Sequence, residues 1–154
     1  MVASLVAAIA YWSASQAKQG LNREKWLALG RLSYCLQGVT ILGIVGILFI
    51  IIRGHFFEYK YVWQHSSLDM PMRYLLSCFW EGHEGSTLLW LFWNAVLGMV
   101  LIFKAKEWES EVLTVFAICQ VCLASMILGI YVFDYRLGSS PFILLKDAMD
   151  IPIF

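Results

Sequence analysis

The stretch that most constrains the fold runs from residue 32 to residue 52, where 21 consecutive residues carry no charged side chain. A membrane-spanning helix needs about 20 predominantly apolar residues, because the hydrocarbon core of a bilayer is about 30 Å thick. Gly38, Gly43 and Gly46 interrupt this stretch, and small residues let neighbouring helices approach closely in a membrane. The stretch therefore predicts a transmembrane helix that packs against others.

The rest of the chain is consistent with a membrane protein. Its residues are 60% hydrophobic and only 14% charged, which lies outside the usual range of soluble proteins. Its net charge of zero excludes the basic surface that nucleic-acid binding requires. Further apolar stretches cover residues 2–15, 86–103 and 112–133, and the first is too short for a complete span. We expect an all-α fold, a polytopic transmembrane bundle of about four spans with the first one truncated.

Charge and turn residues predict how the spans are connected. Residues 16–31 carry four basic side chains against one acid, so the positive-inside rule places them in the cytoplasm. Residues 53–85 then lie on the outer face, where apolar residues at helical spacing after Pro71 predict a short interfacial amphipathic helix. The tail from Asp134 has loop chemistry, so we expect residues 1–154 to be a single membrane module and a fragment of a larger multi-span protein.

The candidate site lies between Tyr61 and Trp93, where polar and aromatic residues gather beside a predicted span. Its candidate ligand-binding residues are His65, Trp80, His83, Glu84, Gly85, Ser86 and Trp90. Ionisable groups at membrane depth are expensive and usually functional. If one helix runs through residues 80–94, His83 and Glu84 point apart by roughly 100°, so they are not an obvious acid–base pair. The sequence assigns no catalytic residue and no metal-ligand set.

Three interpretations of His83 stay open. It is an interfacial histidine that holds helices together, or part of a pocket wall with Glu84, or a direct metal or haem ligand. Gly82 and Gly85 bracket it and permit close contact with a ligand or with another part of the chain. His65 is expected in a solvated loop on the same side.

Cys119 and Cys122 have the C-x-x-C spacing of zinc and thiol-redox sites. They lie in an apolar run, so we predict two small buried side chains with neither activity. A membrane redox protein that works through these thiols is an alternative, and it would require them to react with a water-soluble alkylating agent.

The motifs Tyr61-Val-Trp-Gln-His-Ser66 and Phe79-Trp-Glu-Gly-His-Glu-Gly-Ser-Thr-Leu-Leu-Trp90 resemble the N-terminal part of the haem lyase family of cytochrome c maturation, CcmF, NrfE and the CcsA-type proteins. Glu81 departs from the family pattern and adds an acid. The family's tryptophan-rich haem-binding segment and axial histidines lie further along and have no match in this chain, so haem is implied as the cofactor of the full-length protein only.

The resemblance implies a multi-pass protein of the bacterial inner membrane with its motifs on the periplasmic side. It would handle haem for covalent attachment to apocytochrome c, beside haem-delivery or thiol-reducing maturation subunits, and this fragment would not be catalytic by itself. An alternative from another class is a structural or transport subunit of a membrane complex with no haem role.

Overall fold

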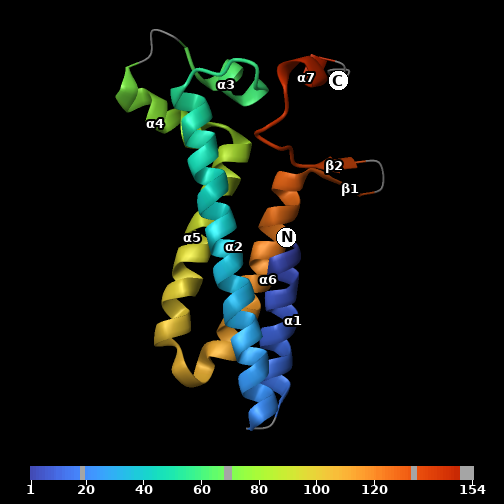
Figure 1. Cartoon of the computed structure of the whole chain (residues 1–154). Coiled ribbons are helices and arrows are strands. Elements are labelled where there is room, and N and C mark those ends of the chain that lie inside the picture. Colours follow the sequence, from blue (N-terminus) through green and yellow to red (C-terminus); the bar gives the residue numbers. More distant parts are fainter. Residues whose placement is uncertain (18–19, 68–70, 133–134, 150–154) are drawn as a thin grey trace. The chain divides into compact units, whose positions relative to one another are not determined.

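The computed structural model describes residues 1–17, 20–67, 71–132 and 135–149. Most of the described residues are helical (Figure 1). The elements are α1 (Val2–Gln16), α2 (Leu21–Arg53), α3 (Lys60–His65), α4 (Met72–Glu81), α5 (His83–Lys104), the 3₁₀ turn η1 (Lys106–Trp108), α6 (Glu109–Leu128), β1 (Ile130–Val132), β2 (Tyr135–Leu137) and α7 (Leu145–Met149).

Three stretches in the described part of the chain are long and apolar enough to cross a membrane: Leu21–Arg53, His83–Lys104 and Lys106–Leu128. The predicted all-α, polytopic architecture is confirmed. Helix α1 has 15 residues, which fits the prediction of a short first span. Helix α4 occupies the place predicted for the amphipathic helix.

Two boundaries differ from the prediction by more than three residues. Helix α2 begins at Leu21 and not near residue 32, because residues 21–31 continue the helix and leave only a short connection after α1. Helix α6 ends at Leu128, because Gly129 has a φ of 65° and leads into an antiparallel hairpin in which Ile130 pairs with Leu137. The predicted span to residue 133 is therefore wrong beyond Leu128, and Phe133 itself lies outside the described residues.

The chain forms two compact units. Unit 1 comprises Met1–Leu42 and Trp90–Ser125, and unit 2 comprises Gly43–Leu89 and Met126–Phe154. The prediction that residues 1–154 are one module of a larger protein stays a prediction.

Unit 1 is held together by a buried apolar cluster from three helices. Its fully buried members are Ala7, Tyr11, Tyr34, Leu113 and Ala117. The predicted close approach at Gly38 is present, because a Cβ built there would lie 3.4 Å from the Met99 sulfur. A Cβ built on Gly43 or Gly46, by contrast, would have no described atom within 4 Å. Only the first of the three glycines therefore marks a close helix contact.

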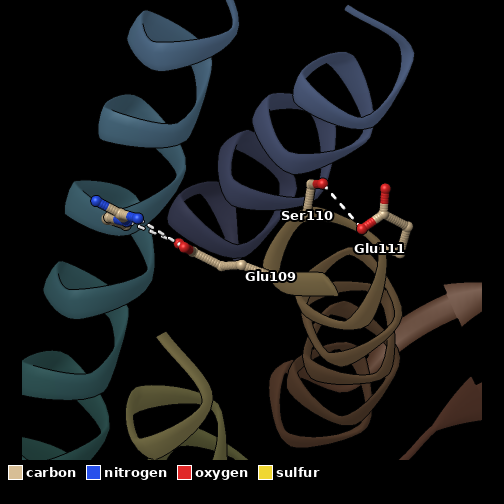
Figure 2. A network of polar contacts seen from close by, with 4 residues as sticks. Glu109, Ser110 and Glu111 are labelled. Atoms are coloured by element: carbon tan, nitrogen blue, oxygen red, sulfur yellow. Dashed lines mark hydrogen bonds and ion pairs between the residues drawn. The ribbon is translucent and has the colours of Figure 1, made fainter. Parts of the chain in front are cut away.

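Polar contacts also join the helices of unit 1. Arg31 donates two hydrogen bonds to the Glu109 carboxylate, at 2.7 and 2.6 Å, and Glu109 opens α6 (Figure 2). The Tyr34 hydroxyl donates to the Asn94 carbonyl oxygen at 3.0 Å. A negative charge in the first turn of a helix is favourable, since free N–H groups point toward it.

Unit 2 brings the C-terminal segment to the start of α3. Tyr59 and Leu144 form an isolated antiparallel bridge, the Lys60 amide donates to the Ile143 carbonyl, and the Leu145 amide donates to the Glu58 carbonyl. These backbone bonds hold α3 in place beside the turn between α4 and α5.

Candidate functional site

The chain turns sharply between α4 and α5 at Gly82, whose φ of −84° and ψ of 161° are extended. Trp80 therefore belongs to α4 and His83 to α5. The expected single helix through residues 80–94 is wrong at its beginning. Residues 83, 87, 90 and 94 do share α5 at helical spacing. We call residues 78–86 the α4–α5 corner.

Hydroxyl groups from α3 and α5 close this corner. The last carbonyls of a helix have no partner within that helix. The Tyr61 hydroxyl lies 3.0 Å from the Cys78 carbonyl oxygen and 2.9 Å from that of Phe79, and Ser86 Oγ donates to the Trp80 carbonyl at 2.8 Å. Burial raises the pKa of Tyr61 to about 12, so its hydroxyl stays protonated and able to donate at neutral pH.

Gly82 and Gly85 let α3 come close to the corner. A Cβ on Gly82 would lie 2.7 Å from the Tyr61 ring, and one on Gly85 would overlap the Phe79 carbonyl oxygen and the Tyr61 hydroxyl. Both glycines therefore serve packing within the chain. The sequence had left open whether they face a ligand or another segment.

His65 is held against the corner and is not a loosely solvated loop residue. Its ring stacks on Tyr61 with centroids 4.6 Å apart. Its Nδ1 lies 2.9 Å from the Tyr61 carbonyl oxygen, which can only accept, so Nδ1 carries the proton. Nε2 faces Gly82, because a Cβ built there would lie 3.1 Å from it. His65 Nδ1 is thus engaged by the Tyr61 carbonyl, and Nε2 lies on the side of the ring that faces Gly82.

His83 and Glu84 have different surroundings. His83 is exposed at the start of α5. Glu84 is half-buried and accepts a short hydrogen bond from Ser139 Oγ in the segment that follows the hairpin. This agrees with the expectation that the two side chains diverge. No cluster of three or more potential metal ligands occurs among the described residues.

The tryptophans of the candidate site present flat surfaces. Trp80 is 47% exposed at the end of α4, and Trp90 is 66% exposed on α5. Trp80 belongs to unit 2 and Trp90 to unit 1. Gly85 is buried and Ser86 half-buried within the corner.

Sequence reasoning missed two residues that build the site, Tyr61 and Ser139. Tyr61 begins the first motif, but nothing in its spacing shows which carbonyl groups its hydroxyl would reach. Ser139 follows Gly138 in the tail that the sequence predicts to be a loop. Both contacts join segments distant in sequence, so only the folded chain reveals them.

The predicted burial of Cys119 and Cys122 is wrong, since both side chains are exposed on α6. Leu113, Ala117 and Gln120 occupy the buried side of that helix, and positions 119 and 122 project away from it. A thiol is apolar enough to face lipid at little cost, so an apolar surrounding sequence does not imply burial inside the protein.

The chain is similar to part of a cytochrome c-type biogenesis protein. It is 33% identical over 64 residues to the CcmF protein of Haemophilus influenzae (strain ATCC 51907 / DSM 11121 / KW20 / Rd). The match covers 42% of this chain and 10% of the relative, so the chain aligns with about a tenth of that protein's length. No protein-family profile and no solved structure matches the chain.

Proposed function

We propose that this chain acts in cytochrome c maturation, as the N-terminal membrane module of a haem lyase that handles haem as its substrate. The similarity to CcmF and the motifs around His65 and His83 support the process. The observation that carries the proposal is the α4–α5 corner, where the first motif packs against the beginning of the second within unit 2.

Within this proposal the corner supports a haem site that is completed elsewhere. Tyr61, His65 and the two glycines fix the corner, while Trp80 and His83 remain exposed on it. An exposed indole offers a flat apolar face for a porphyrin, and an exposed imidazole can donate to a propionate. The corner thus supplies a wall and hydrogen bonds, and the iron ligands come from other parts of the protein.

The proposed setting follows from the same similarity. The protein would lie in a bacterial inner membrane with the corner on the periplasmic side. Apocytochrome c would be the acceptor, and haem-delivery or thiol-reducing subunits would be partners. The membrane-spanning helices make lipid its immediate surroundings.

Replacing His83 and Glu84 together with alanine in the full-length protein tests the proposal. We expect the yield of holocytochrome c to fall severalfold while the amount of protein in the membrane stays normal. Glu107→Ala is the matched control, since that exposed carboxylate lies in η1, away from the corner in sequence. An unchanged yield would remove both residues from the mechanism.

One observation favours the alternative, a structural or transport subunit without a haem role. Glu84 accepts its hydrogen bond from Ser139 of the same chain. Such a contact is expected of a residue whose role is to hold two segments of the chain together. A haem absorbance spectrum of the purified full-length protein separates the two functions. A haem lyase should show haem bands and a transport subunit should not.

A further inference from the structure

Unit 1 contains buried polar side chains with atoms that have no hydrogen-bond partner among the described residues. Ser4, Gln37 and Gln120 are 0%, 4% and 0% exposed. Four of their atoms, Ser4 Oγ, both amide atoms of Gln37 and Gln120 Oε1, have no hydrogen-bond partner in the described part of the chain. Buried polar groups in native proteins are nearly always hydrogen-bonded to protein or water, so each of these atoms requires an explanation.

The positions of Ser4 and Gln37 follow from the packing of Tyr11 on α1 against Gly30 on α2. The Tyr11 ring on α1 lies against Gly30 on α2, because a Cβ built on Gly30 would be 3.1 Å from it. Two residues that are seven apart in sequence project from nearly the same side of a helix, and they are separated by about 10.5 Å along its axis. Ser4 precedes Tyr11 by seven residues and Gln37 follows Gly30 by seven. Since α1 and α2 run in opposite directions (Figure 1), the two side chains arrive at one level.

The same seven-residue spacing on α6 gives the position of Gln120. Leu113 packs in one buried cluster with Tyr11, and Gln120 follows Leu113 by seven residues. Helix α6 also runs opposite to α1 (Figure 1). Gln120 therefore reaches the level of Ser4, on the buried side of its helix.

Contacts with α5 give an independent check of this level. The Tyr34 hydroxyl donates to the Asn94 carbonyl at 3.0 Å, and Gln120 Nε2 donates to the Leu91 carbonyl at 3.2 Å. Leu91 lies about one turn from Asn94, as Gln37 lies about one turn from Tyr34. Gln37, Leu91 and Gln120 therefore lie in the same part of the bundle. We call Ser4, Gln37 and Gln120 the polar layer.

The chemistry of the polar layer selects its ligand. Its unpaired atoms include an amide donor on Gln37, carbonyl acceptors on Gln37 and Gln120, and a hydroxyl on Ser4 that does both. None of the three side chains is ionisable, so an ion would be left without charge compensation in a low-dielectric interior. A small neutral ligand that both donates and accepts hydrogen bonds fits these groups best.

We propose that the polar layer of unit 1 binds internal water, which bridges the amide groups of Gln37 and Gln120 and the Ser4 hydroxyl. Buried waters in proteins typically make about three hydrogen bonds to otherwise unsatisfied groups. This hydration site lies among helices of the bundle, and it does not depend on the proposed role in haem handling.

Solid-state NMR of the whole chain in deuterated lipid bilayers tests the site through transfer of magnetisation from water protons to side-chain amide nitrogens. We expect transfer to the Gln37 amide at a rate within about threefold of that at Gln64, which is exposed. Absence of transfer to Gln37 would overturn the proposal, and it is the result expected if the two glutamines bond directly to each other.

Variants show whether the water is shared. Gln37→Leu should reduce water transfer to the Gln120 amide at least twofold, whereas Gln64→Leu, the matched control, should leave it unchanged. Equal transfer to Gln120 in a folded Gln37→Leu protein would contradict a bridging water. If that variant fails to fold, Ser4→Ala gives the same comparison with a smaller change in volume.

Discussion

At the scale of single residues, the ion pair between Arg31 and Glu109 is asymmetric in burial. The Glu109 side chain is 3% exposed and that of Arg31 is 50% exposed. Removing the arginine leaves a buried carboxylate without a counter-charge, whereas neutralising the glutamate leaves an arginine that can still reach water. The two partners should therefore differ in their effect on stability, although they share the same pair of hydrogen bonds.

We expect Arg31→Met to lower the free energy of unfolding by about 3 kcal/mol, and Glu109→Gln by about 1 kcal/mol. Denaturant unfolding of the chain in detergent micelles measures both. Lys25→Met is the control, since this lysine is exposed on the same helix. Equal losses for the two variants would contradict the asymmetry.

At the scale of elements, length and hydropathy were enough to find the long helices, because a run of about 20 apolar residues has few other stable solutions in a membrane. The same reasoning could not find the break at Gly82 or the early end of α6 at Leu128. The break depends on hydroxyls that come from α3 and α5, and the hairpin after Gly129 depends on pairing between strands. The sequence identified the motif residues, but it did not predict where they lie within the α4–α5 corner.

The corner makes a matched pair of glycine substitutions informative. Gly85→Ala places a methyl group on the Phe79 carbonyl oxygen and the Tyr61 hydroxyl, so the corner must open and the protein should lose about 2 kcal/mol or more. Gly43→Ala meets open space on α2 and should be neutral or stabilising by up to about 1 kcal/mol. Unfolding curves of both variants test this, and equal behaviour would mean that α3 does not pack on the corner.

At the scale of the whole molecule, the exposed tryptophans report on immersion in the bilayer. Trp93 is 53% exposed near the middle of α5, about 15 Å along the axis from His83. Trp63 is 57% exposed on α3, outside the stretches long enough to span. Tryptophan usually favours the membrane interface, which suits Trp63 but not a residue at the centre of a span.

Single-tryptophan variants in bilayers of brominated lipids should therefore give opposite depth profiles. We expect the fluorescence of Trp93 to be quenched most by bromines near the bilayer centre, and that of Trp63 most by bromines near the headgroups. Helix α5 has charged residues at both ends and an apolar interior. Only a helix that spans the bilayer places both of these ends in water and the interior in lipid. Quenching of Trp93 by shallow bromines would contradict a spanning α5, and a Trp93 that neither set quenches would show that protein covers this face in the membrane.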